Sequence, residues 1–271
     1  MSTAAWQVDA VVRAAEEGEG YKNPGVGDFW QPLFGGEGAF AITRPSIVIL
    51  LSVAILSVLL LAFTKRLSVV PSRKQLATES TYGLVRNGLG RDIIGSHDFL
   101  KFVPLLFTMF VLILLNNLFS VIPPIQYPTM SRVAFPAALA LVVFVVYHLV
   151  GFRKHGVVGY FKSIIPAGLS IGLAIPIFFL ELVTDLFTRP VTLALRLFGN
   201  MFAGHLLLVL FISGGEYLLL EGAGALKLAG VASLFMSFVM TVFEILVQVL
   251  QAYIFTLLTA LYIAGAVADE H

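Results

Sequence analysis

The chain of 271 residues is 58% apolar and only 12% charged, and its formal net charge is +1. Soluble domains carry about 25% charged residues, so a water-exposed fold of this length would lack much of its usual surface charge. The near-neutral charge gives no reason to expect nucleic acid as a partner, and the absence of cysteine excludes disulfides, thiolate metal sites and cysteine nucleophiles.

Motifs of soluble enzymes are also missing. The five histidines show no metal-ligand spacing such as HExxH, and the sequence has no GxSxG, P-loop or GxGxxG motif. We therefore expect no metal, no cofactor and no catalytic site in this chain. The composition predicts an all-α integral membrane protein, because helices satisfy their own backbone hydrogen bonds in lipid.

The predicted membrane domain covers residues 47–271 and follows an amino-terminal segment, residues 1–46. That segment carries Gly and Pro turn signals and one short predicted helix near Ala4–Glu17. No basic region precedes an early apolar stretch, which argues against a cleaved signal peptide. Three apolar runs that approach the length needed to cross a bilayer core of about 30 Å follow in order: Ile47–Phe63, Phe102–Ile122 and Phe135–Val150.

Basic residues predict which side of the membrane each end faces. Only Arg13, Lys22 and Arg44 precede the first run, whereas the linker to the second run holds seven basic residues: Lys65, Arg66, Arg73, Lys74, Arg86, Arg91 and Lys101. Cytoplasmic loops carry an excess of Lys and Arg, so this linker is expected in the cytoplasm and the amino terminus outside. About five membrane-embedded helices then place the carboxyl terminus in the cytoplasm.

The last hundred residues predict a long helical hairpin, at about 169–268. Leu169–Ile212 and Leu228–Ala268 are apolar, and Ser213–Lys227 between them is a glycine-bearing loop. The 34 positions from Val231 to Ala264 contain neither Gly nor Pro. Such a helix would be about 50 Å long, against a core of about 30 Å, so we expect a strongly tilted helix with an equally long partner.

Charged residues stand inside both long segments, where each costs about 2.5–3.5 kcal/mol on insertion scales. The first segment holds Glu181, Asp185, Arg189 and Arg196, and the second holds Glu244. Helical periodicity puts Asp185, Arg189, Thr192 and Asn200 within about 40° of Arg196, which predicts one polar stripe. Gln248 and Gln251 fall equally close to Glu244 and predict a second stripe.

These charges admit structural readings as well as functional ones. Glu181, Asp185 and Arg189 fit a self-neutralising ladder at four-residue spacing, and Glu244 and Gln251 fit hydrogen bonding between helices. Arg196 has no carboxylate one turn away, which favours a functional role.

The roles expected for the histidines follow from their positions in the predicted spans and from the pairing register of the hairpin. Antiparallel pairing about the predicted loop makes facing positions add up to roughly 441, so Arg196 lies opposite residue 245 and His205 opposite about residue 236. His205 lies about 180° round the helix from Arg196, and a structural role for it stays open. His148 and His155, at a span end, are interpreted as interfacial.

Two runs of sequence carry a family resemblance. Residues 189–205 read RPVTLALRLFGNMFAGH and residues 250–259 read LQAYIFTLLT. The first resembles the signature helix of F-type ATP synthase subunit a, and the second resembles the last helix of that family. The outside amino terminus, the order of spans and the final hairpin agree with the resemblance.

The resemblance implies a proton-translocating stator subunit of a rotary ATP synthase, in the plasma membrane of a bacterium. It implies two aqueous half-channels that lead to the carboxylates of a c-subunit ring, with b subunits of a peripheral stalk, the remaining subunits and the lipid bilayer as further partners. Arg196 matches the essential arginine of the family, and Asn200, His205, Glu244 and Gln251 match positions of the outer half-channel. Some bacterial relatives carry the carboxylate at position 205 and the imidazole at position 244, so the pair is exchanged here. Further possible channel-lining residues are Asp185, Arg189, Gln248, Asn116 and Asn117.

Two other classes of membrane protein compete with this interpretation. A secondary ion-coupled transporter also binds ions near mid-membrane, but it usually shows internal repeats and helices broken at corresponding positions, and we find no repeat. An intramembrane hydrolase would need a Ser–His, paired-Asp or zinc arrangement, and the sequence shows none. Elution only within a large complex would favour the stator subunit over the transporter.

Overall fold

The computed structural model describes residues 32–34, 42–64, 72–122, 127–163 and 171–268, and the helix expected near 4–17 lies outside them. Helices dominate the described part of the chain, and a two-stranded antiparallel ribbon precedes the first of them. In chain order the elements are β1 (Pro32–Phe34), β2 (Ile42–Thr43), α2 (Arg44–Thr64), α3 (Arg73–Gly83), the π-helix η2 (Leu84–Arg91), α4 (Asp92–Ile94), the 3-10 helix η3 (Phe99–Lys101), α5 (Val103–Phe119), the 3-10 helix η4 (Thr129–Ser131), α6 (Ala134–Ser163), α7 (Ile171–Val183), the π-helix η5 (Thr184–Thr188), α8 (Arg189–Leu220) and α9 (Ala225–Val267).

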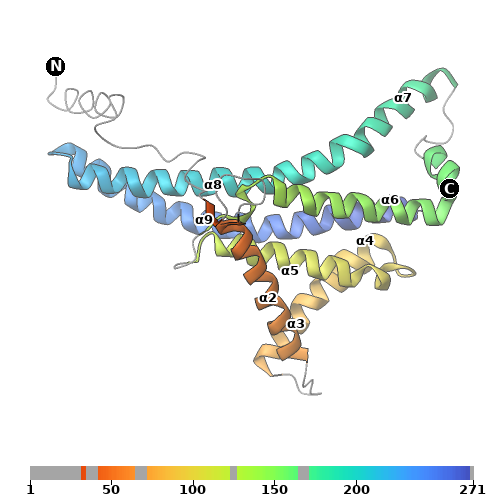
Figure 1. Cartoon of the computed structure of the whole chain (residues 1–271), viewed down its shortest axis with the longest axis horizontal. Helices are drawn as coiled ribbons and strands as arrows, with labels where there is room; N and C mark the ends of the chain where they lie inside the picture. Colours follow the sequence, from red (N-terminus) through yellow and green to blue (C-terminus); the bar gives the residue numbers. More distant parts are fainter. Residues whose placement is uncertain (1–31, 35–41, 65–71, 123–126, 164–170, 269–271) are drawn as a thin grey trace.

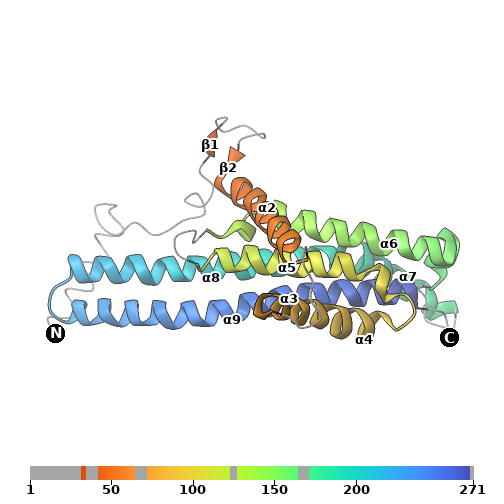
Figure 2. The same cartoon turned by 90° about the horizontal axis from the view of Figure 1, so that it is seen from below.

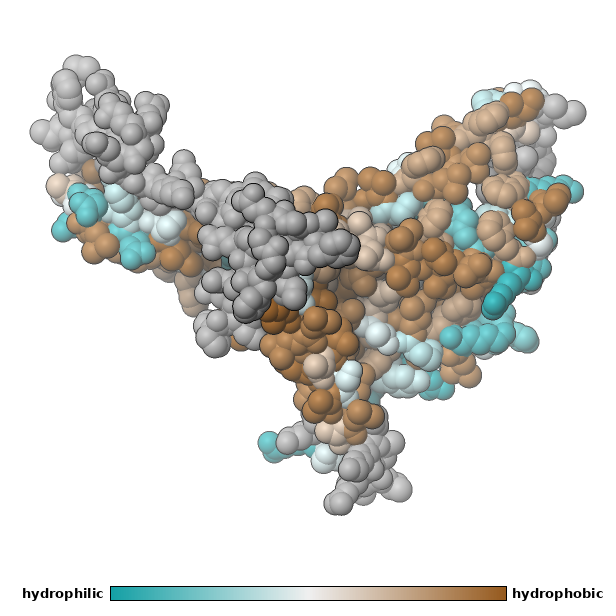
Figure 3. All heavy atoms as spheres, in the orientation of Figure 1, coloured by the Kyte–Doolittle hydropathy of each residue, from teal (hydrophilic) through white to brown (hydrophobic). Residues whose placement is uncertain are grey.

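The molecule is a multi-pass membrane protein by the length and composition of its helices. Four helical segments are long and apolar enough to cross a membrane: Pro45–Ala62, Ala134–Lys162, Gly172–Leu220 and Ala225–Val267. The apolar α5 is shorter, at 17 residues. Figure 3 shows apolar surface over most of the face it presents, with hydrophilic residues gathered toward both ends of the long axis. Four spans and one short apolar helix agree with the prediction of about five embedded helices.

Helices α8 and α9 form the predicted hairpin and lie side by side along the long axis (Figures 1 and 2). The prediction of an unbroken final helix is confirmed, because α9 runs for 43 residues without interruption. The predicted loop Ser213–Lys227 is wrong in its extent, since α8 continues to Leu220 and α9 begins at Ala225. A Cβ atom at Gly215 would lie 3.0 Å from Leu234 and 3.2 Å from the carbonyl oxygen of Gly230. Glycine there allows close helix approach rather than a loop.

The partner of α9 is bent rather than straight. Figure 1 shows α7 leaving the line of α8, and the π-helix η5 (Thr184–Thr188) lies at the junction. A π-turn takes up more residues per turn than an α-turn, so side chains before it are rotated relative to those after it. The predicted single polar stripe is therefore wrong: Asp185 is buried and Arg196 is exposed.

The core is built where α5, α6 and α8 pack against α9. Leu106, Ile113, Leu197, Phe255 and Ile263 are fully buried in it. The π-helix η2 adds further buried side chains, so part of the linker between α2 and α5 joins the core. Helix α6 extends well beyond the predicted Phe135–Val150.

Candidate functional site

A chain of buried hydrogen bonds joins α9 to α5. Gln248 Nε2 donates to Glu244 Oε1 at 2.9 Å and to Ser120 Oγ at 2.5 Å, and Ser120 Oγ donates to the carbonyl oxygen of Asn117 at 2.9 Å. Asn117 Nδ2 in turn donates to the carbonyl oxygen of Gln248 at 3.1 Å. We call Asn117, Ser120, Glu244 and Gln248 the amide cluster. It holds one oxygen of a buried carboxyl group in a fixed position.

Several polar atoms of this region have no protein partner within the described residues. They are Asn117 Oδ1, Glu244 Oε2, Gln248 Oε1 and the neighbouring Gln251 Nε2. A buried polar atom without a hydrogen bond costs about 1–3 kcal/mol, and ordered water is the usual remedy. Glu244 also lines a cavity of about 200 Å³ together with Asn200 and Gly204. The amide cluster and this cavity are suited to hold water beside a titratable group.

The register of the hairpin follows from two contacts. Ser233 Oγ donates to the carbonyl oxygen of Phe211 at 2.8 Å, and Glu244 Oε1 would lie 3.2 Å from a Cβ at Gly204. Facing positions thus add up to 444–448, not 441, because the turn is shorter and further along the chain than predicted. Arg196 then lies opposite residues 248–252, which include Gln251.

The glycine at position 204 makes room for the carboxyl group of Glu244. In a Gly204→Ala variant the new Cβ would displace Glu244. On the function that the family resemblance implies, we therefore expect proton translocation to fall about tenfold, although alanine favours the helix by about 1 kcal/mol. Gly172→Ala is the matched control, because a Cβ there meets nothing within 4 Å. ATP-driven proton pumping by membrane vesicles measures both, and equal activity of the two variants would show that Glu244 tolerates the displacement.

Arg196 is exposed on α8, and nearby apolar residues of the same helix, Val191 and Leu195, are exposed too. Val191 is 49% exposed and Leu195 is 50% exposed. No carboxylate of the described residues lies within ion-pair distance of Arg196. His205 is buried, in agreement with the predicted half-turn between the two side chains. A cation on an apolar helix face requires a counter-charge or water from outside the chain.

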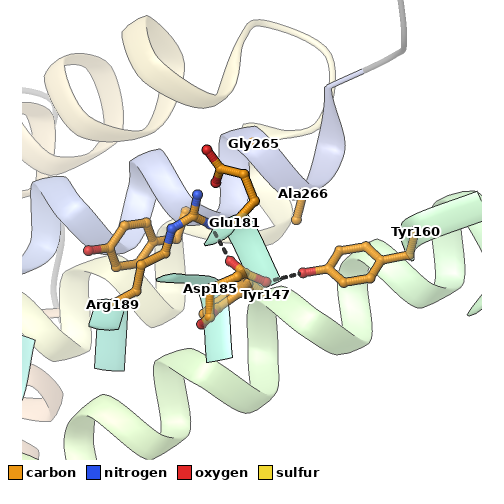
Figure 4. Close-up of a pocket in the computed structure, with 8 residues that line it drawn as sticks. Tyr147, Tyr160, Glu181, Asp185, Arg189, Gly265 and Ala266 are labelled. Atoms are coloured by element: carbon orange, nitrogen blue, oxygen red, sulfur yellow. Dashed lines mark hydrogen bonds and ion pairs between the residues drawn. The ribbon is translucent and has the colours of Figure 1, made fainter. Parts of the chain in front are cut away.

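A second polar centre surrounds Asp185, and Figure 4 shows Asp185 with Arg189, Tyr147 and Tyr160. Arg189 Nη1 forms an ion pair with Asp185 Oδ1, and Tyr160 Oη donates to Asp185 Oδ2 at 2.9 Å. His148 Nε2 lies 3.4 Å from the same Oδ2, and Tyr147 Oη donates to the carbonyl oxygen of Asp185 at 2.8 Å. We call these five residues the Asp185 cluster. The predicted Asp185–Arg189 pair exists, but three side chains of α6 complete it.

Two glycines of α6 bring Tyr160 to Asp185. Gly156 has a φ of 70°, which kinks the helix and which a residue with a Cβ rarely adopts. The chain beyond the kink returns Tyr160 to Gly151, where a Cβ would come within 2.4 Å of the tyrosine ring. A cavity of about 170 Å³ beside Asp185 is also lined by Arg189 and Glu181.

The sequence pattern does not predict the α6 side of this cluster. His148 was interpreted as interfacial, but it is only 8% exposed and lies against Asp185. A lone histidine near a span end carries little signal. The one available clue was the pair of glycines that precede Tyr160, which allow the chain to fold back.

Asn116 and Asn117, neighbours in α5, differ in their contacts. Asn116 Nδ2 donates to Ser52 Oγ at 2.9 Å, and Asn116 Oδ1 accepts from Thr129 Oγ1 at 3.1 Å. This arrangement favours a packing role for Asn116, which joins α2, α5 and η4. Asn117 instead belongs to the amide cluster, and its channel-lining role stays a prediction.

The protein has several helices that can cross a membrane and two buried titratable centres, one at Glu244 and one at Asp185. Arg196 is exposed on α8 between these centres. Together these features are typical of a membrane protein that moves ions. A sequence model of the family described as "ATP synthase A chain" matches residues 46–264. The protein named "ATP synthase subunit a" of Nocardioides sp. is 47% identical over 276 residues, covering 97% of this chain and 98% of the relative. Proteins with the same name from Pseudarthrobacter chlorophenolicus and Streptomyces lividans are each 40% identical, over 97% and 94% of this chain and 99% and 91% of the relative. The chain belongs to the ATP synthase subunit a family.

This membership supports a proton-translocating role in the stationary part of an ATP synthase. It also implies that the chain works as one subunit of a larger complex in a membrane.

Proposed function

We propose that this chain conducts protons to and from a ring of c subunits through two separate aqueous half-channels, and that Arg196 keeps the two apart. The observation that carries the proposal is the position of Arg196. It is exposed on α8, with the amide cluster toward one end of the hairpin and the Asp185 cluster toward the other. Asp185 precedes Arg196 by eleven residues, about 16 Å of helix.

The chemistry of arginine suits this position. A guanidinium group stays protonated in proteins, so it gives a fixed positive charge and does not relay protons. Facing a passing ring carboxylate, it favours the ionised form and so favours release of the proton on the exit side. Because it cannot pass a proton on, it also prevents a direct leak between the half-channels.

The two polar centres supply the half-channels in this proposal. Glu244, His205, Asn200 and Gln251 serve the outer side, with Gln248 and Asn117 holding water beside Glu244. The Asp185 cluster and its cavity serve the cytoplasmic side. Each proton that crosses contributes about 2.3 kcal/mol per 100 mV, so many ring carboxylates must pass Arg196 in turn to make ATP. The amino terminus lies outside and the carboxyl terminus in the cytoplasm.

Cross-linking tests whether the α8 face meets the ring. Leu195→Cys, beside Arg196, should form a cross-link with a cysteine introduced next to the carboxylate of a c subunit. The control is Leu141→Cys on α6, which is 59% exposed against 50% for Leu195. The chain has no native cysteine to confuse the result. A cross-link at Leu141 and none at Leu195, in vesicles that hold the intact complex, would place the ring on the wrong face for this proposal.

A further inference from the structure

Both ring nitrogens of His148 face hydrogen-bond acceptors. Nδ1 lies 2.9 Å from the carbonyl oxygen of Phe144, and Nε2 lies 3.4 Å from Asp185 Oδ2. A carbonyl oxygen only accepts hydrogen bonds, so Nδ1 must carry a hydrogen. In the neutral ring, the unprotonated Nε2 would then lie 3.4 Å from a carboxylate oxygen, and the two electron-rich atoms would repel each other. A second proton, placed between Nε2 and Oδ2, removes this repulsion.

The other groups around Asp185 are not free to supply that proton. Arg189 keeps its protons at any accessible pH. Tyr160 and Tyr147 already donate their hydroxyl hydrogens to Asp185, to Oδ2 and to the carbonyl oxygen respectively. Tyr262 of α9 and Glu181 of α7 complete the set of titratable groups that line the neighbouring cavity. Arg189 neutralises the carboxylate of Asp185, and Glu181 brings a second carboxyl group to the same cavity.

We propose that His148 and Asp185 share one exchangeable proton, with Asp185 as the group that meets the cavity and His148 as the group that stores the proton behind it. This rests on the function proposed above and adds His148 to the cytoplasmic half-channel. The cavity of about 170 Å³ has room for several water molecules beside Asp185. A proton arriving on water transfers to the carboxylate of Asp185 and from there to the lone pair of His148 Nε2. The reverse transfer returns it to water and leaves the ring neutral, with its hydrogen on Nδ1.

Storage matters most where free protons are scarce. At acid pH, hydronium in the cavity can serve Asp185 directly, whereas at alkaline pH the stored proton is the main local source. His148→Phe preserves ring packing against Phe144, whose ring centroid lies 4.1 Å away, and removes both nitrogens. We expect proton pumping by the variant complex to fall about twofold near pH 6 and about tenfold near pH 9.

The controls separate proton exchange from structure. His155→Phe, on the same helix, should leave pumping unchanged. A purely structural defect of His148→Phe would lower the rate by the same factor at every pH, and that result would overturn the proposal. His148→Gln is the second variant in case the phenylalanine variant does not assemble, and it should show the same loss toward alkaline pH. The ¹⁵N spectrum of histidine-labelled complex should contain a doubly protonated ring that disappears in His148→Phe and persists in His155→Phe.

The same vesicles distinguish this proposal from the one on which it rests. Substantial pumping by Arg196→Ala would remove the proposed function. An inactive Arg196→Ala beside a His148→Phe variant with the wild-type rate and pH profile would remove only the role of His148.

Discussion

Replacement of Arg196 by alanine should abolish proton-coupled ATP synthesis while the complex still assembles. The side chain is exposed and has no ion-pair partner among the described carboxylates, so its loss removes no internal contact that the fold requires. What it removes is the fixed charge that favours an ionised ring carboxylate. Removal of one such electrostatic group typically costs about 10²–10³ in rate, so synthesis should fall at least a hundredfold. Synthesis by energised vesicles, normalised to assembled complex, gives the measurement.

Two further variants sharpen this result. Arg153→Ala removes an exposed arginine of α6 and should leave synthesis unchanged. Arg196→Lys should couple poorly, because a lysine can lose its proton when desolvated and so leak protons. Wild-type synthesis by Arg196→Ala would mean that another group separates the half-channels.

The exchanged pair, His205 and Glu244, gives the second large effect. The observed register puts Glu244 beside Gly204, at the height of His205, whereas the register inferred from sequence placed them two turns apart. If the pair works as an acid and an imidazole, His205→Glu and Glu244→His should each lower proton pumping about tenfold. Each leaves two like groups together, which titrate differently from a mixed pair. The double exchange should recover much of the loss, since neighbouring groups couple by about 0.5–3 kcal/mol.

Pumping by inverted vesicles across a pH series compares the two single variants with the double variant. The matched control exchanges residues that are not neighbours, His155→Glu together with Glu244→His, and should show no recovery. Losses that simply add, with the double variant worse than both single variants, would show that positions 205 and 244 act independently.

The sequence predicted the long hairpin because its signal is local. The absence of Gly and Pro from Val231 to Ala264 leaves an α9 helix no place to break, and the length against the bilayer demands a tilt. The prediction of the loop was wrong because the structure there depends on a tertiary contact between the two helices. Gly214 and Gly215 read as a turn in isolation, but the structure uses Gly215 for close contact with Gly230 and Leu234.

The site was predictable in part for the same reason. Residues spaced by helical periodicity within α9, such as Glu244, Gln248 and Gln251, do share a buried face. Asp185 and Arg196 do not share a face, because the π-helix η5 rotates one side chain relative to the other. No local sequence pattern predicts that π-helix. Tyr147 and His148 reach Asp185 from another helix, and a single sequence holds no signal for that contact.

The length of α9 has a consequence for the direction of proton movement. A helix of 43 residues is about 65 Å long, so keeping it within a core of about 30 Å tilts it about 60° from the membrane normal. The 18-residue separation between Glu244 and Tyr262 then spans about 13 Å of depth but about 23 Å along the membrane plane. Entry and exit are farther apart sideways than across the bilayer. On the proposed mechanism, a proton can complete its crossing only on a carrier that moves in the plane, and the tilt of one helix thereby turns a transverse voltage into a tangential force.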